Sequence, residues 1–162
     1  DALPILRTEE DVLALRQAVA DGIIDVIGTD HAPHPAESKE CEWACAANGM
    51  TGLEQALSII QMTLVEPGHI TWADVARIMS ETPAKIGSLD AEQGRPLAEG
   101  EPANIVLVDP KASRAIKPED QATKGKNNPY RGMEVPGVVR ATFYAGHPTV
   151  LNGELASPRR QA

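Results

Sequence analysis

Apolar residues recur at helical spacing near the start of the chain and then give way to a short apolar run. Thr8 precedes three carboxylates and is the expected N-cap, and Gly22 is the expected stop of this helix. The residues at helical spacing are Val12, Leu15 and Val19. Residues 23–28 (IIDVIG) are mostly apolar and β-branched. This pattern predicts a strand covered on both faces in a parallel sheet.

Three later stretches carry the start signals of helices. Thr51 with Glu54, and Thr71 with Asp74, fit the capping box, in which each side chain satisfies a backbone N–H of the other residue. The first box precedes an apolar stripe made by Leu53, Leu57, Ile60 and Leu64. Thr82–Pro83 predicts a third short helix, because Pro is favoured at the first helical position.

Beyond Gly94 the pattern changes to that of β-structure. Three segments predict strands: 104–109 (NIVLVD), 138–144 (VVRATFY) and 149–151. Asp109–Pro110 is the expected end of the first strand, and Asn152–Gly153 is a hairpin turn. The order of elements predicts an α/β region followed by antiparallel β-structure.

A polar segment without periodicity, residues 35–50, separates the first predicted strand from the next helix. Loops of this length in compact domains are commonly functional. Trp43 in this loop is expected to anchor it to the core rather than to contact a ligand.

Composition and charge narrow the classes of function. The 162 residues include 15 Lys and Arg against 23 Asp and Glu, a net charge of −8. A nucleic-acid surface needs clustered basic residues, and the one basic pair is Arg159–Arg160. No apolar run approaches the roughly 20 residues of a membrane span. Two cysteines do not make a secreted disulfide framework, so we expect a cytoplasmic protein.

The sequence GTDHAPH follows the first predicted strand and places Asp30 where reactive side chains lie in parallel α/β proteins. Asp30 is suited to bind a metal ion and to accept a proton. In one alternative, Asp30 only caps a turn, and His31 and His34 are surface residues. In another, His31, His34, Cys41 and Cys45 hold a structural zinc as H-x2-H-x6-C-x3-C.

The same motif resembles the last barrel-strand motif of dihydroorotases in the amidohydrolase superfamily. The similarity extends to ALPILR before the first helix, to GMTGLEQAL after the loop, and to GEPANIVLVD and NNPYRGMEVPGVVRATFYAGHPTVLNG. Hydantoinases and allantoinases share the Asp-His pair but usually lack the Ala-Pro-His continuation. DHAPH therefore favours dihydroorotase over these relatives.

The resemblance implies an α/β fold that combines the last part of a TIM-type (β/α)8 metal-dependent hydrolase barrel with a small β-sandwich domain. Residues 1–96 would belong to the barrel and residues 97–162 to strands of the sandwich and a tail. Within the barrel part we expect the last barrel strand at 23–28, the catalytic motif at 29–34, the loop at 35–50 and helices to about residue 89. The family's other metal-binding His residues and bridging carboxylate have no match in this sequence. An N-terminal part of the barrel is therefore an expected partner.

The resemblance also implies a reaction. In the family, a hydroxide shared by two zinc ions opens the cyclic amide of dihydroorotate to N-carbamoyl-L-aspartate, a reversible step of pyrimidine synthesis. Asp30 would be the metal ligand and the proton shuttle, and His34 a substrate contact. Asn48 and Gly49 would approach the substrate through their backbone, and His31 would orient the loop or Asp30.

Several alternatives stay open at this point. The chain could have hydantoinase-like or allantoinase-like specificity, or it could be a non-catalytic interaction domain, either stapled by zinc or descended from an enzyme. We expect a small-molecule substrate and a homo-oligomer, with no nucleic-acid partner and no membrane.

Overall fold

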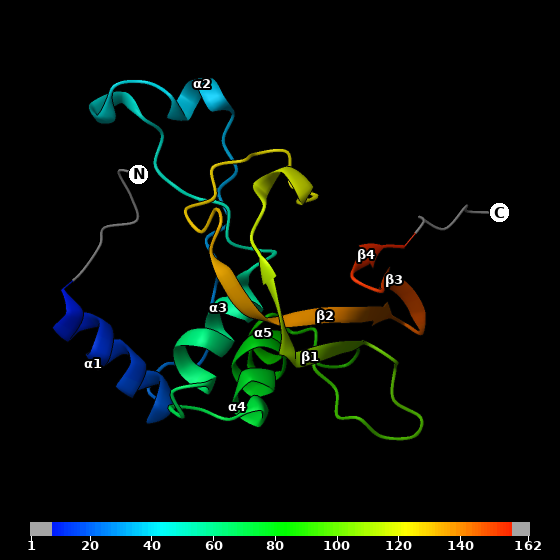
Figure 1. The fold of residues 1–162 in the computed structure, drawn as a ribbon. Coiled ribbons are helices and arrows are strands. Elements are labelled where there is room, and N and C mark those ends of the chain that lie inside the picture. The colour runs from blue at the N-terminus through cyan, green and yellow to red at the C-terminus, as the bar shows by residue number, and fades with distance from the viewer. Residues whose placement is uncertain (1–7, 157–162) are drawn as a thin grey trace.

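A computed structural model describes residues 8–156 as a group of helices packed against a four-stranded antiparallel sheet, with a long loop projecting from one end (Figure 1). The ALPILR stretch and the Arg159–Arg160 pair lie outside these residues. No helix among residues 8–156 combines the length and the apolar character that crossing a bilayer requires.

The first predicted helix is confirmed as α1 (Glu9–Ala20). The Thr8 hydroxyl accepts a hydrogen bond from the Asp11 backbone nitrogen at 3.3 Å, and the Asp11 carboxylate accepts from the Thr8 backbone nitrogen at 3.1 Å. This reciprocal pair is a capping box, so the N-terminal signal is stronger than Thr8 alone. Gly22 follows the helix with a φ of +71°, the left-handed conformation that ends many helices.

Residues 23–28 form no strand in the described structure, so the predicted ladder is absent there. Ile24 and Ile27 pack against the core, but the Ile23 side chain is 73% exposed. A β-ladder requires neighbouring strands. Beside this segment the described residues supply one isolated parallel bridge, between His31 and Met50.

The loop over residues 35–50 contains two short helical turns, α2 (Ala36–Lys39) and η1 (Trp43–Cys45), at the top of Figure 1. Trp43 does not anchor this loop, since its side chain is 67% exposed. The expectation that it packs into the core was wrong.

The predicted capping box at Thr51 was also wrong. The next helix, α3 (Ala56–Ile60), begins five residues later, and its N-cap, Gln55, makes no side-chain capping bond. Glu54 instead accepts hydrogen bonds from the backbone nitrogens of Ala122 and Thr123, 3.2 and 3.1 Å away. A tertiary contact therefore replaces the local one, and a π-helical turn, η2 (Gln61–Val65), continues α3.

The second capping box is confirmed at the start of α4 (Trp72–Ala76), where Thr71 and Asp74 bond each other's backbone nitrogens. A π-helical turn, η3 (Arg77–Glu81), leads directly into α5 (Thr82–Ile86). The segment that begins at Thr82 is therefore helical as predicted, but it continues the preceding helix rather than starting a separate one.

The second half of the chain forms the sheet. Its strands lie in the order β1 (Ile105–Ala115), β2 (Glu134–Tyr144), β3 (His147–Leu151) and β4 (Glu154–Leu155). All pairings are antiparallel, as predicted. Asp109–Pro110 does not end β1, because the register shifts between Asp109 and Ser113 and the strand continues past the proline.

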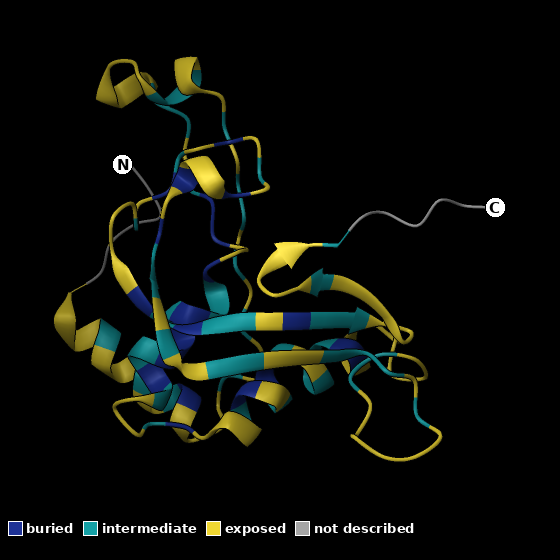
Figure 2. Cartoon of the chain, turned by 45° about the vertical axis from the view of Figure 1, so that its right-hand side comes forward, coloured by how far each residue is buried: buried dark blue, intermediate teal, exposed yellow. Residues whose placement is uncertain are grey.

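The buried core lies between the end of α1 and the helices α3–η2 and α4–η3 (Figure 2). Its members are Val19, Ile60, Leu64, Ile70, Val75 and Ile78. The Ser58 hydroxyl donates to the Gly137 carbonyl at 3.0 Å and so fixes α3 against β2. A turn of 3-10 helix, η4 (Pro118–Asp120), and residues 121–133, which we call the β1–β2 connection, bring the chain back beside the projecting loop (Figure 1).

Candidate active site

Asp30 lies at the end of the extended segment, with a φ of +46° and an exposed side chain. Positive φ is uncommon for residues other than glycine, although Asp adopts it more readily than most. Within residues 8–156 the Asp30 carboxylate has no hydrogen-bond or ion-pair partner, so it does not cap the following turn. The carboxylate is therefore available to a metal ion or a proton.

His31 is half-buried and bonds the turn that precedes α3. Its Nδ1 atom accepts hydrogen bonds from the backbone nitrogens of Gly52 and Leu53, at 3.1 and 3.2 Å. An imidazole nitrogen that accepts two N–H groups carries no proton, so the proton of the neutral ring is on Nε2. This contact holds the residue after Asp30 against the turn that precedes α3.

The structure brings together His34, Asn48 and Gly49, which lie on both sides of the loop. His34 Nε2 lies 2.8 Å from the Asn48 carbonyl oxygen. Since a carbonyl can only accept, His34 donates through Nε2 and its Nδ1 atom remains for other contacts. Gly49 has a φ of +114°, and a Cβ there would lie 2.6 Å from the Ala32 Cβ. Only glycine fits this close approach.

Lys39 bonds the backbone at the end of the loop. Its Nζ donates to the carbonyl oxygens of Ala47 at 2.8 Å and Gly49 at 3.1 Å. The two ends of the loop also meet directly, since the Ala32 backbone nitrogen donates to the Met50 carbonyl at 2.9 Å. These bonds give the loop a defined base beside the motif.

Asn127, in the β1–β2 connection, contacts this base and was not predicted. Its side chain bonds Ala32 and Gly49 as well as the backbone nitrogen of His34. The sequence KGKNNP around it is polar and rich in turn-forming residues. No spacing rule links it to a motif 93 residues earlier, and only the resemblance of NNPYRG to the family drew attention to this stretch.

The zinc-staple alternative is wrong for this structure. Cys41 and Cys45 are free and exposed, while ring nitrogens of His31 and His34 bond backbone groups. Across residues 8–156 no three His, Cys, Asp or Glu side chains lie close enough to hold a metal ion. Asp30 nevertheless fits one position of a metal site, because it is an exposed oxygen donor without a competing partner.

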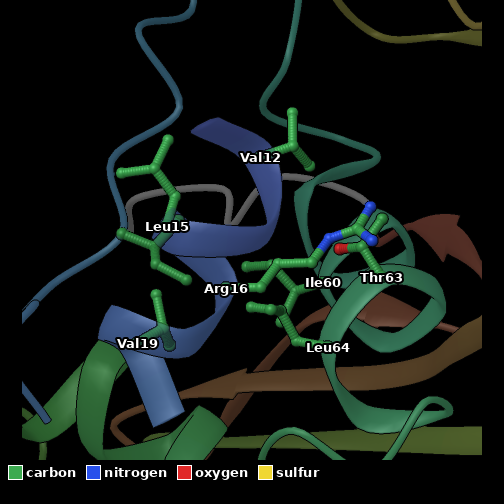
Figure 3. Close-up of a pocket in the computed structure, with 8 residues that line it drawn as sticks. Val12, Leu15, Arg16, Val19, Ile60, Thr63 and Leu64 are labelled. Carbon is green, nitrogen blue, oxygen red and sulfur yellow. The ribbon is translucent and has the colours of Figure 1, made fainter. Parts of the chain in front are cut away.

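Two hollows lie near these elements. The more open one is an apolar groove in which Val12, Leu15 and Val19 of α1 face Ile60 and Leu64 (Figure 3). The other lies against the extended segment and is lined by Thr29, Met50 and Tyr130 among mostly apolar residues. Neither includes Asp30 or His34, so the candidate site is the exposed rim formed by the motif and the loop base.

A sequence profile of the amidohydrolase family matches residues 2–149. The chain belongs to the amidohydrolase family. Among curated amidohydrolase relatives, dihydroorotases from Streptomyces coelicolor and Mycobacterium tuberculosis are 53% and 48% identical over 152 residues. The match covers 94% of this chain and 35% of each relative, so the chain spans about a third of their length.

Solved structures agree on the fold of this amidohydrolase chain. An L-hydantoinase from Arthrobacter aurescens has a TM-score of 0.87 and 29% identity over 95% of this chain and 35% of its own. A D-hydantoinase from Thermus sp. has a TM-score of 0.85 and 26% identity over 96% of this chain and 34% of its own. The chain is therefore an α/β portion of the amidohydrolase fold.

Proposed function

We propose that this chain forms part of a zinc-dependent dihydroorotase that interconverts (S)-dihydroorotate and N-carbamoyl-L-aspartate in pyrimidine synthesis. The observation that carries this proposal is the arrangement of the rim. A carboxylate without a partner, Asp30, precedes the group formed by His34, Asn48 and Gly49. The 53% identity to a dihydroorotase supports this substrate over those of the hydantoinases.

The proposal includes the surroundings of the rim. Residues 23–28 would become the last strand of a TIM-type barrel once neighbouring strands supply a ladder, and the four-stranded sheet would contribute to a β-sandwich domain. The barrel's N-terminal part would carry the remaining metal ligands. A cytoplasmic location, expected from the cysteine content, and homo-oligomeric assembly belong to the same proposal.

Asp30 would hold zinc through its carboxylate and move a proton. Zinc, when bound, supplies a Lewis acid that polarises the amide carbonyl. Asp30 would accept a proton from the attacking water and deliver it to the ring nitrogen as the C–N bond breaks. Its exposure and lack of a competing partner suit both tasks.

The loop base would bind the substrate. His34 would donate from Nδ1 to the substrate carboxylate or carbonyl with both ring nitrogens protonated, because its Nε2 already donates to the Asn48 carbonyl. Gly49 has two donors on its carbonyl, from Lys39 and Asn127, so its N–H is the backbone group left for the ring. The loop over residues 35–50 would close over the substrate and exclude water.

The test is dihydroorotate ring opening by the zinc-loaded, full-length protein that carries this chain. We expect D30N to lower kcat about 10²- to 10⁴-fold, the usual contribution of general acid–base catalysis. D25N is the matched control, since Asp25 is an exposed carboxylate of the same segment. Equal activity of D30N and wild type would contradict the role of Asp30.

Substrate choice separates the two cyclic-amidase candidates. The hydantoinase-like alternative is favoured by the TM-score of 0.87 to an L-hydantoinase. Opening of hydantoin or dihydrouracil rings with no turnover of dihydroorotate would establish it. If no cyclic amide is opened and no zinc is bound, the chain is a non-catalytic descendant.

A further inference from the structure

We propose that Asn127 is a positioning residue that fixes the two substrate-binding turns, at His34 and at Asn48–Gly49, relative to each other. The proposal rests on the proposed function of these turns. It concerns a residue from the β1–β2 connection, which the sequence places in the sheet half of the chain.

The side-chain amide of Asn127 is used completely. Its Oδ1 accepts from the His34 backbone nitrogen at 2.9 Å. Its Nδ2 donates to the carbonyl oxygens of Ala32 at 2.9 Å and Gly49 at 3.2 Å. One planar group therefore joins the motif to the end of the loop through one acceptor and two donated hydrogens.

The chemistry of these contacts requires an amide. Two of the three partners are carbonyl oxygens, which can only accept, and the third is an N–H, which can only donate. A carboxylate at this position would place an oxygen against both carbonyls, and a methyl group would leave all three backbone groups without this partner.

The backbone near Asn127 also contacts both turns. The Asn127 carbonyl accepts from the Thr51 backbone nitrogen at 3.1 Å, just after the second turn. Gly125 packs against the motif so closely that a Cβ would lie 2.6 Å from the Pro33 Cβ and 2.9 Å from the His34 nitrogen. The connection thus touches both turns through side chain and backbone.

The connection is itself anchored away from the rim. Lys126 Nζ donates to the carbonyls of Gln121 and Thr123 at 3.0 and 2.8 Å. Glu54, just before α3, accepts from the Ala122 and Thr123 backbone nitrogens at 3.2 and 3.1 Å, and the Gln121 side chain donates to that of Gln55 at 3.2 Å. Asn127 therefore transmits a fixed position from the protein body to the two turns.

Asn128 provides a matched control. It is the same residue type at the next position, and none of its side-chain bonds reaches the motif or the loop. N128D makes the same chemical change as N127D, but it affects only the bond from Asn128 to Gln121 and leaves the bonds to the two turns in place.

The experiment compares N127D, N127A and N128D in the zinc-loaded, full-length protein, with kcat, KM for dihydroorotate, zinc content and thermal stability measured for each. We expect kcat/KM of both Asn127 variants to fall about 10- to 100-fold, as for other residues that orient a site. The loss should lie mainly in KM, with zinc content unchanged, because Asn127 does not contact Asp30. N128D should lose stability and keep the wild-type KM.

A wild-type KM in N127D, or an equal rise of KM in N128D, would overturn the positioning role. If the wild type does not open dihydroorotate, the proposed function fails, and amide hydrogen exchange still decides the role of Asn127. We then expect the His34 amide to exchange faster in N127A than in wild type and at the wild-type rate in N128A. Unchanged exchange in N127A would overturn the inference.

Discussion

The Nδ1 atom of His31 lies 3.1 Å from the backbone nitrogen of Gly52, so the residue after Asp30 is bonded to the turn that precedes α3. Leu53 donates to the same atom at 3.2 Å. This relationship fixes both the ring orientation and the tautomer of His31. It also connects the candidate catalytic residue to the helical part of the fold.

We expect His31 to stabilise the fold through its hydrogen-bond acceptor, the Nδ1 atom, rather than through the rest of the imidazole ring. An Asn side chain can place Oδ1 near the position of Nδ1, so H31N should stay within about 0.5 kcal/mol of wild type in free energy of unfolding. H31F leaves two backbone N–H groups without this acceptor and should cost about 1–3 kcal/mol. Urea unfolding of both variants measures this difference, and equal loss in the two would contradict the interpretation.

The contact of Gly125 with the motif leads to a second prediction. In G125A the new methyl group would meet Pro33 at 2.6 Å and must displace the motif or the β1–β2 connection. We expect a loss of about 1–3 kcal/mol, as for other overpacked sites. G28A is the control, since a Cβ at Gly28 meets nothing within 4 Å. Thermal unfolding should separate the two, and an equal shift of Tm in both would refute the close approach.

The cysteines should be dispensable. Cys41 and Cys45 are exposed and free, and no metal-binding cluster includes them within the described residues. The double variant C41S/C45S should change the free energy of unfolding by less than about 0.5 kcal/mol. Zinc content per chain should stay at the wild-type value. Loss of folding or of zinc would restore the staple alternative.

Low pH should weaken the pairing of Asp109 with Arg140, at the register shift of β1, and so lower the stability of the fold. Hydrogen bonding from Arg140, then from the Lys111 and Ala112 backbone nitrogens, lowers the pKa of Asp109 from its usual 3.8. A carboxyl with a lowered folded pKa stabilises the protein above its unfolded pKa, and this stability is lost as the pH falls through the folded value.

The matched variant for this effect is D109N, which keeps an oxygen acceptor and does not titrate. Between about pH 5 and about pH 2, wild type should lose more stability than D109N in unfolding experiments. The difference should be small and should shrink in salt, because the Asp109 and Arg140 side chains are 38% and 53% exposed. Parallel pH profiles would contradict the assignment.

Two predicted capping boxes, each a Thr followed three residues later by an acidic residue, show how far local patterns predict this fold. Thr71 and Asp74 form theirs because both ends of the motif are exposed and have no better partner. Thr51 does not form one, because Glu54 bonds the distant Ala122 and Thr123 nitrogens. The buried Thr51 hydroxyl is left without a partner within residues 8–156. Local sequence cannot predict which contact wins.

The candidate site likewise combines residues that the sequence indicates with a residue that it does not. The resemblance ties Asp30, His34 and Gly49 to one motif and one loop, and the structure brings His34 and Gly49 together, while the roles of all three stay predictions. Asn127 was not predictable from spacing, since its role depends on how the chain returns after β1. The strand predicted over residues 23–28 is absent from the described structure for a related reason: a ladder needs neighbouring strands, and residues 8–156 supply none beside this segment.

The bonds of Asn127 bear on how this protein can be recombined. A boundary at residue 96 separates the helices from the sheet in sequence, yet it also separates Asn127 from the Ala32, His34 and Gly49 backbone that it bonds. Chimeras between relatives joined at this boundary would inherit the two sides of the rim from different parents. Crossovers after residue 133 would keep the rim from a single parent, but they would separate β1 from its partner β2, so no single crossover exchanges the sheet without dividing either the rim or the sheet.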